Sequence, residues 1–374
     1  MTDTMRTWAE INTNALVQNY HYAKSLTGKK IMAVIKGDAH GHGAVRCGAV
    51  LEAAGADAFA VATLGEAVAL REGGIRRPVL ILGWTPAEEA QTLAKYDLAQ
   101  SVFDEGYAEE LNAAAAAIGA TLPIHIKLDT GMSRTGIFAQ NCAAEAAAAL
   151  MRIMALPALR TEALFTHFAA ADMPEKDDFT AWQLENYKAV LAELERLGAD
   201  LSSLTRHIGN SACIMYHKET HFDMVRMGVM MYGLYPDGAI KEQGELQPVL
   251  TLKSRVVQVK ELPAGAHISY GCTAVTEKPT KIAVVGAGYA DAYPRRMSNR
   301  GAYAVINGVR CPQIGRICMD LCMFDVTGVD VHRGDEVILY GRGGMPMELV
   351  AELADSINCE PTSVLTQRVA KVYV

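Results

Sequence analysis

The spacing of apolar residues changes near Pro236, and each part of the chain has its own rhythm. Between Lys30 and Pro236, short runs of β-branched or apolar residues alternate with longer Ala-, Leu- and Glu-rich segments whose apolar positions recur at helical spacing. This alternation is typical of repeated strand–helix units. The predicted strands are 31–35, 58–62, 79–82, 99–103, 124–128, 162–166, 206–208 and 224–227.

The segments between these runs predict helices that pack on a sheet. Runs of alanine at 113–117 and 146–149 suit close packing of a helix against strands. We predict a closed (β/α)₈ barrel over 12–236 rather than an open doubly wound sheet, because no GxGxxG sequence follows the first strand. The predicted helices include 44–54, 64–72, 86–96, 105–118, 142–150 and 182–197.

After Pro236 the apolar positions alternate with period two, which is typical of half-buried strands. Turn sequences such as Asn307-Gly308 separate the runs, and a single clear helix is predicted at 347–357. We therefore predict a second, mostly β domain over 237–374, which the N-terminal segment 1–11 joins as a strand. The predicted strands are 250–259, 281–285, 303–306, 322–326 and 336–340.

Composition and charge exclude several classes of function. The chain of 374 residues has 35 Lys plus Arg and 42 Asp plus Glu, a net charge of −7, so its field disfavours nucleic acid as a partner. No apolar run is long enough for a membrane span, and 1–11 lacks the apolar core of a signal peptide, which predicts a cytoplasmic protein. The 8 cysteines form no CxxC pair, so neither a metal site nor a disulfide framework is predicted.

Polar residues follow the predicted barrel strands where those strands end. Active sites of such barrels lie at the carboxyl ends of the strands, so these residues should face one pocket. Their lysine, histidine and arginine side chains suggest an anionic ligand. The ring contains Lys36, Asp38, His40, His42, Asp129, Arg134, His167, Asn210, Ser211, Arg226 and Gly228.

Two features of this ring point to pyridoxal 5′-phosphate. Gly209-Asn210-Ser211 and Gly228-Val229 fall after the last two strands, where barrels often bind phosphate. Lys36 ends an apolar strand, where partial burial lowers an amine pKa and frees it for covalent bonding to an aldehyde. Taken singly, a lysine after a strand is more often a solvated charge, and His42 and His207 are more often structural hydrogen-bonding residues.

A set of motifs runs in order along the whole chain, at 33–43, 127–136, 166–168, 207–211, 225–228, 269–271, 288–291 and 315–320. In these motifs the chain resembles the alanine racemases among the fold-type III pyridoxal phosphate enzymes. That resemblance implies a barrel followed by a β domain, a shared-site homodimer and a small amino-acid substrate.

The resemblance also implies roles for individual residues. Lys36 would hold the cofactor and act as one base, and Tyr270 of the partner subunit would act as the other on the opposite face of the substrate. Arg226 would donate to the pyridine nitrogen, and His167 would contact the cofactor and the tyrosine. The phosphate contacts implied are Asn210, Ser211, Gly228 and Val229; the substrate contacts are Arg134, Met319 and Tyr289; and Lys127 matches a lysine that is carbamylated in some members.

Four residues depart from the family's usual pattern, of which Ala292, in place of a glycine, has no evident consequence. His40 replaces a tyrosine, Asp38 replaces an asparagine, and Cys359 replaces a tyrosine that contacts the phosphate and narrows the pocket. The loss of two aromatic contacts implies weaker cofactor retention, and the smaller Cys359 implies room for serine as an alternative substrate. More distant alternatives are a fold-type III amino-acid decarboxylase and a non-catalytic pyridoxal phosphate-binding protein.

Overall fold

The computed structural model describes residues 4–239 and 245–374, and they form two compact units. The first, here called the barrel unit, comprises residues 20–38 and 44–231. The second, here called the β unit, comprises the segment up to residue 19, residues 39–43, and the chain from residue 232 to its end. Within the described ranges, no helix is both long and apolar enough to cross a lipid bilayer.

The barrel unit contains eight parallel strands that form a nearly closed barrel, as the sequence predicts. Neighbours pair in the order β10-β2-β3-β4-β5-β6-β8-β9, and at the remaining gap the amide of Arg226 donates to the carbonyl of Gly209 at 2.8 Å. Apolar side chains such as Met32, Ala60 and Leu80 pack together in its core. The strands are β2 (Lys30–Val34), β3 (Ala58–Val61), β4 (Val79–Ile81), β5 (Ala99–Val102), β6 (Leu122–Asp129), β8 (Leu159–Phe165), β9 (Thr205–Arg206) and β10 (Met224–Met227).

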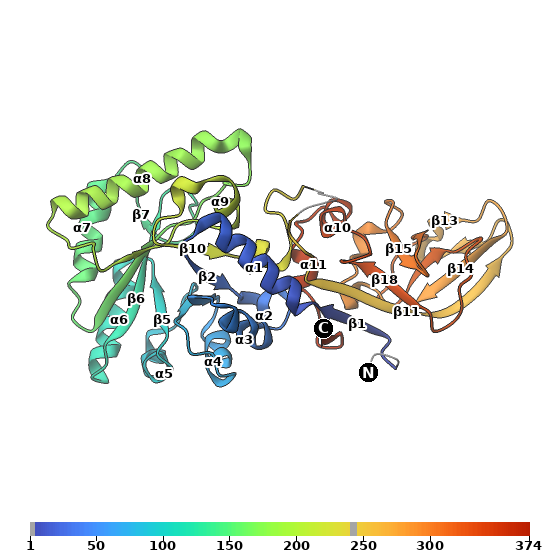
Figure 1. The fold of residues 1–374 in the computed structure, drawn as a ribbon, viewed down its shortest axis with the longest axis horizontal. Coiled ribbons are helices and arrows are strands. Elements are labelled where there is room, and N and C mark those ends of the chain that lie inside the picture. The colour runs from blue at the N-terminus through green and yellow to red at the C-terminus, as the bar shows by residue number, and fades with distance from the viewer. Residues whose placement is uncertain (1–3, 240–244) are drawn as a thin grey trace. The chain divides into compact units, whose positions relative to one another are not determined.

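Helices surround these strands on the outside (Figure 1). Thr63 and Glu66 close a capping box at the start of α4, and Asp104 caps α6, so both helices begin where a short polar side chain accepts the first amides. The predicted helix 86–96 is instead a 3₁₀ turn, Ala87–Glu89, followed by α5. The helices are α3 (Ala44–Ala54), α4 (Leu64–Glu72), α5 (Ala90–Lys95), α6 (Glu105–Ala117), α7 (Ala143–Met154), α8 (Asp177–Arg196) and α9 (Ser211–Tyr216), and α1 spans Thr13–Thr27.

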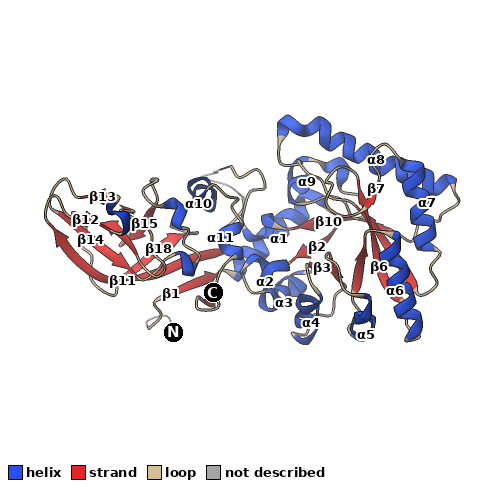
Figure 2. Cartoon of the chain, turned by 180° about the vertical axis from the view of Figure 1, so that it is seen from behind, coloured by secondary structure: helices blue, strands red, loops and turns tan. Residues whose placement is uncertain are grey.

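The β unit is built on a mainly antiparallel sheet, drawn in red in Figure 2. Strand β1 (Thr7–Ile11) lies antiparallel to β11 (Leu250–Leu262) and parallel to β19 (Ala370–Tyr373), so the two termini of the chain pair in one sheet. The other elements are β12 (His267–Ile268), β13 (Ala274–Val275), β14 (Thr280–Val285), β15 (Tyr303–Ile306), β16 (Val309–Pro312), β17 (Cys322–Asp325), β18 (Glu336–Tyr340), α10 (Met347–Ala354) and α11 (Glu360–Ser363).

Candidate functional site

The polar ring predicted from the sequence follows the carboxyl ends of the barrel strands. Lys36 comes two residues after β2, His167 two residues after β8, and Gly228 directly after β10. Parallel strands bring their carboxyl ends to one rim, so these side chains share one end of the barrel unit.

The backbone that follows Lys36 is strained. The φ angles of Gly37, Asp38, Ala39, His40 and Gly41 are 61°, 52°, 56°, 51° and 86°, so the short element α2 (Lys36–His40) winds left-handed. For a residue with a Cβ this conformation costs about 1–2 kcal/mol, and such strain concentrates at functional sites.

Carboxylates anchor both ends of this left-handed turn within the barrel unit. Oε1 of Glu66 accepts from the amide of Gly37 at 2.6 Å, and Oδ1 of Asp38 accepts from the amide of Ala44 at 2.7 Å. Glu66 was not singled out in the sequence; its place in a capping-box pattern, three residues after Thr63, is the signal that could have identified it.

Residues 39–43 belong to the β unit, and His42 has a structural role there. Its Nδ1 donates to the carbonyls of Ala39 and His40, at 2.9 and 3.0 Å. Its ring stacks on Tyr232 with centroids 4.4 Å apart, and the ring of His40 lies 4.8 Å from the same tyrosine. His40 is buried.

Arg226 is fixed by the backbone and by histidines. Nη1 donates to the carbonyl of His207 and lies 3.2 Å from His207 Nδ1. Nη2 donates to the carbonyl of Thr166 at 2.8 Å and lies 3.0 Å from Nδ1 of His167. Burial lowers the pKa of Arg226 to about 10, so the guanidinium stays charged at neutral pH.

The histidines beside this guanidinium are neutral. Burial, followed by the charge of Arg226, lowers the pKa of His167 well below its ordinary value. Because an arginine can only donate, the Nδ1 of His167 must accept from it, and the proton of this neutral imidazole sits on Nε2. His167 therefore presents a donor at Nε2.

Lys127 is buried on β6 and donates to Thr135 Oγ1 at 2.6 Å. Burial, with the charges of Arg134 and Arg226, lowers its pKa to about 8. Arg134 itself is exposed on the loop after β6. That loop is shaped by Asp129, whose Oδ1 accepts the amides of Gly131 and Ser133 at 3.1 and 2.9 Å.

The loops after β9 and β10 are joined to each other. Ser211 Oγ accepts the amide of Gly228 at 2.9 Å, so this predicted phosphate donor is satisfied inside the protein. Asn210 caps α9 by accepting the amide of Cys213 at 3.0 Å. A Cβ at Gly228 would find only Ser211 Oγ, at 3.6 Å, so the backbone there is open to a ligand, and Val229 begins the next turn.

In the β unit, a buried carboxylate supports Tyr289 and Met319. Asp291 is fully buried and accepts from Arg6, Arg368 and the amide of Gly288, at 2.7 to 2.9 Å. The amides of Tyr289 and Ala290 donate to the carbonyls of Cys318 and Met319, at 3.0 and 3.1 Å. Asp291 ends the motif at 288–291, and nothing in the sequence distinguishes it as a buried support.

Tyr270 is exposed on a strained turn. Its exposed fraction is 65%, and its neighbours Ser269 and Gly271 have φ angles of 65° and 71°. Arg295 lies over both the Tyr270 and Tyr289 rings, at 5.8 and 6.0 Å. Tyr270, Met319 and Leu321 line a shallow concavity of 570 Å³ on the β unit.

Cys359 precedes α11 and is half-buried. Its carbonyl accepts from the hydroxyls of Thr362 and Ser363, at 3.1 and 2.7 Å. Neighbouring Asn358 is buried and donates to the carbonyl of Tyr235 at 2.8 Å. The backbone of Cys359 is thus fixed whichever side chain it carries.

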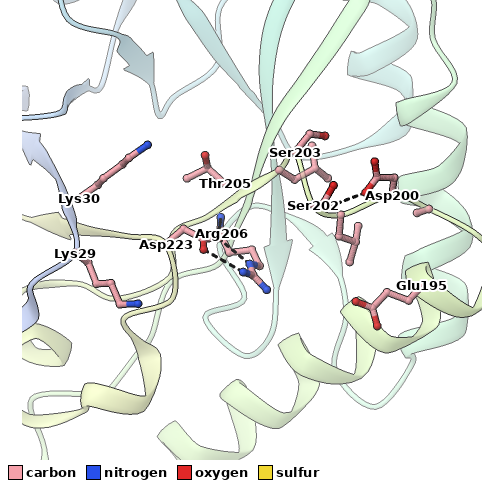
Figure 3. Close-up of a pocket in the computed structure, with 12 residues that line it drawn as sticks. Lys29, Lys30, Glu195, Asp200, Ser202, Ser203, Thr205, Arg206 and Asp223 are labelled. Atoms are coloured by element: carbon pink, nitrogen blue, oxygen red, sulfur yellow. Dashed lines mark hydrogen bonds and ion pairs between the residues drawn. The ribbon is translucent and has the colours of Figure 1, made fainter.

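A cavity of 780 Å³ lies at the opposite end of the barrel unit from the polar ring. Figure 3 shows Lys29 and Lys30 on one side of it, Glu195 and Asp200 on the other, and Arg206 bonded to Asp223 between them. These residues lie at the amino ends of the strands, where barrels carry stabilising rather than catalytic residues. We assign it no part in catalysis.

Comparison with known proteins gives a consistent result over the whole chain. Residues 11–236 match the family described as "Alanine racemase, N-terminal domain", and residues 249–373 match "Alanine racemase, C-terminal domain". The alanine racemase of Desulfosudis oleivorans is 42% identical, covering 98% of this chain and 96% of that protein.

Solved structures are similar as well. The alanine racemase of Clostridium difficile 630 has a TM-score of 0.92 and 36% identity, covering 99% of this chain and 96% of that chain. The alanine racemase from Bartonella henselae with covalently bound pyridoxal phosphate has a TM-score of 0.87 and 26% identity, covering 99% of each chain.

Proposed function

The chain belongs to the alanine racemase family, and on this premise we propose that it interconverts L- and D-alanine with pyridoxal 5′-phosphate as its cofactor. The observation that carries the proposal is the fixed, charged Arg226 at the same end of the barrel unit as Lys36. An arginine paired with the ring nitrogen restrains full delocalisation of charge, which favours proton exchange over elimination or transamination.

The residues present fit this cofactor. Both terminal nitrogens of Arg226 donate to protein groups, whereas no acceptor for its Nε is found among the described residues, which leaves a donor for a pyridine nitrogen. The amide of Gly228 donates to Ser211, but the absence of a side chain at Gly228 leaves space beside Asn210, Ser211 and Val229 that suits a phosphate. His40 and Cys359 complete the proposed contacts. When bound, pyridoxal phosphate stabilises negative charge at the Cα of an amino acid attached to it.

We assign the two proton transfers to Lys36 and to Tyr270 of the partner subunit. One group removes the Cα proton from one face, and the other returns a proton to the opposite face, which inverts the configuration. A homodimer is proposed because Tyr270 is exposed on a concavity whose apolar residues, Met319 and Leu321, suit coverage by a second copy.

Binding and orientation of the substrate fall to three further groups. Arg134 and the backbone of Met319 would hold the carboxylate, and Tyr289 would stand at the entrance. Lys127 is proposed to carry a carbamate that orients Arg134, since its pKa of about 8 supplies the unprotonated amine that carbamate formation needs. The domain limits proposed for these functions are 12–236 and 237–374.

The proposal extends to the range of substrates and to the role of the enzyme in the cell. Cys359 is smaller than tyrosine, and a pocket of this kind discriminates an added hydroxyl by about 10²-fold at best. We therefore propose alanine as the substrate and serine as a secondary one. A cytoplasmic supply of D-alanine for a bacterial cell wall is the accompanying expectation.

The direct test is exchange at Cα in D₂O. The purified protein with added pyridoxal phosphate should convert L-alanine into a deuterated racemate, measured by mass and chiral chromatography. An efficiency with L-serine below a thousandth of that with L-alanine would contradict the enlarged pocket. Loss of CO₂ from L-lysine or L-ornithine would indicate a decarboxylase, and cofactor binding without exchange would indicate a non-catalytic carrier.

A further inference from the structure

A line of polar side chains leads away from Arg226 through the barrel unit and ends at a carboxylate. Nδ1 of His207 lies 3.2 Å from Nη1 of Arg226, and Nε2 of His207 lies 2.9 Å from Nδ1 of His125. Nε2 of His125 faces Glu162, with its Oε2 at 4.0 Å. The line therefore connects β10, the residue after β9, β6 and β8.

Both imidazoles are buried. His207 is fully buried, with Phe165 stacked on its ring at a centroid distance of 4.8 Å, and His125 is 9% exposed. Burial lowers the pKa of His125 to about 3 and that of His207 well below its ordinary value, and the charge of Arg226 lowers both further. Each ring therefore carries a single proton at neutral pH.

The guanidinium decides where these protons sit. Arg226 can only donate, so His207 Nδ1 must accept, and the proton of His207 is on Nε2. That proton points at His125 Nδ1, which must accept it in turn, so His125 also carries its proton on Nε2. The outer N–H then faces the carboxylate of Glu162, which Arg160 also contacts at 2.6 Å.

The same geometry excludes the opposite direction of donation between His125 and His207. If His125 donated through Nδ1, His207 would hold its proton on Nδ1, and two donors would face each other 3.2 Å apart. Adding a second proton to either ring would bury one more positive charge near Arg226. Reversing the direction of donation along this line of hydrogen bonds therefore requires the guanidinium to move.

We propose that His207 and His125 are positioning residues for the reaction: their fixed tautomers hold the guanidinium of Arg226 in one orientation, which leaves Nε as the donor for the cofactor ring. This inference rests on the proposed function. It gives the buried pair a role that packing alone would not require.

The first measurement is the tautomeric state of the histidines in the holoenzyme. In protein labelled with ¹⁵N-histidine, long-range ¹⁵N–¹H spectra should show His125, His207 and His167 as neutral rings protonated on Nε2 between pH 6 and 8. Variants of each histidine assign the signals. A His207 ring protonated on Nδ1, or on both nitrogens, would overturn the proposal without any activity assay.

The second measurement compares two substitutions at His125. Asparagine places an oxygen near the position of Nδ1, so His125→Asn keeps an acceptor for His207, whereas His125→Leu removes it. His125→Leu should lower kcat by about 10²-fold, as expected for a displaced active-site group, with little change in KM. His125→Asn should restore most of that loss.

Tyr107→Phe is the matched control, since Tyr107 is buried in the same unit and donates to the carbonyl of Thr85 at 2.7 Å. It should lower the melting temperature while leaving kcat and the histidine spectrum unchanged. A folded His125→Leu protein with the kcat of His125→Asn would overturn the proposal. If the protein racemises no amino acid, the proposed function fails. The histidine spectrum then still decides whether His207 and His125 have the tautomers that would hold Arg226 in place.

Discussion

At the scale of single residues, burial rather than residue type determines the chemistry of this site. Lys127 lies within β6, and its burial there lowers its pKa from the ordinary lysine value to about 8. The sequence placed Lys127 in a motif but could not supply this shift, because burial depends on which loops fold over the strand. The sequence could not supply the lowered pKa of His125 either, because nothing in it distinguishes His125 from an ordinary strand residue.

The lowered pKa makes carbamylation of Lys127 testable by its pH dependence. Only the unprotonated amine reacts with CO₂, and a pKa of about 8 leaves about a quarter of the amine unprotonated at pH 7.5, against about one part in a thousand for an ordinary lysine. With ¹³C-bicarbonate, the carbamate signal should rise between pH 7 and 9. Lys127→Met should abolish it, and a wild-type spectrum without the signal at pH 8.5 would refute the modification.

The stability of the unmodified protein should also depend on pH through this residue. A lysine whose pKa falls from 10.5 to about 8 on folding binds its proton more tightly in the unfolded chain, so the free energy of unfolding rises with pH between 8 and 10.5. Urea denaturation in CO₂-free buffer should show this rise, and Lys127→Met should flatten it by up to about 3 kcal/mol. Equal slopes in both proteins would contradict the assignment.

At the scale of elements, the sequence predicted those whose pattern is local. Apolar spacing predicted all eight barrel strands, and the bounds that it gave for α3 and α4 match those of the structure. Five short strands were missed, because two to four residues carry too little pattern: β7 (Ile137–Phe138), β12, β13, β16 and β19. The left-handed turn 37–41 was missed because its conformation is imposed by distant anchors such as Glu66 rather than by its own residues.

That turn provides a prediction about Asp38. Its carboxylate accepts the first amide of α3, and aspartate and asparagine tolerate positive φ better than alanine does. Asp38→Ala should therefore lower the free energy of unfolding by about 2 kcal/mol, half from the lost acceptor and half from backbone strain. Asp38→Asn should cost much less in the same urea titration, and equal losses would show that the turn is not held in this way.

The buried carboxylate of Asp291, which supports Tyr289 and Met319, provides another prediction. Asp291 is fully buried, so Arg368→Met would leave it with Arg6 as its remaining cation, at a cost of about 1–3 kcal/mol. Arg300→Met removes an exposed pair with Asp355 and should cost less than about 1 kcal/mol. Thermal denaturation of the two variants compares them directly, and similar melting temperatures would argue against a supporting role for Asp291.

At the scale of the whole molecule, the sequence predicted the two kinds of architecture and the N-terminal strand that joins the second, but not that residues 39–43 also belong to the second. The β unit takes in the N-terminal strand β1, which pairs with β11 and β19, and also residues 39–43, three residues beyond Lys36. A Cβ at Gly41 would collide with the carbonyl of Thr362, and the hydroxyl of Tyr373 donates to the carbonyl of His42 at 3.2 Å. Contacts between residues so far apart in the sequence leave no periodic signal. The motif around Lys36 could therefore be recognised, but the assignment of its residues 39–43 to the β unit could not be foreseen.

The proposed sharing of active sites between two copies can be decided by mixing inactive variants. Lys36→Ala and Tyr270→Ala should each be inactive alone, because each lacks one of the two bases. In a mixed dimer with shared sites, one site contains both substitutions and the other contains neither, so random exchange of subunits should restore about a quarter of the wild-type activity. If both bases belonged to one chain, no site in the mixture would be complete, and activity would stay at the background of the separate variants. Co-purification of differently tagged variants establishes that mixed dimers form, so a mixed dimer without restored activity would contradict the shared site rather than the assembly.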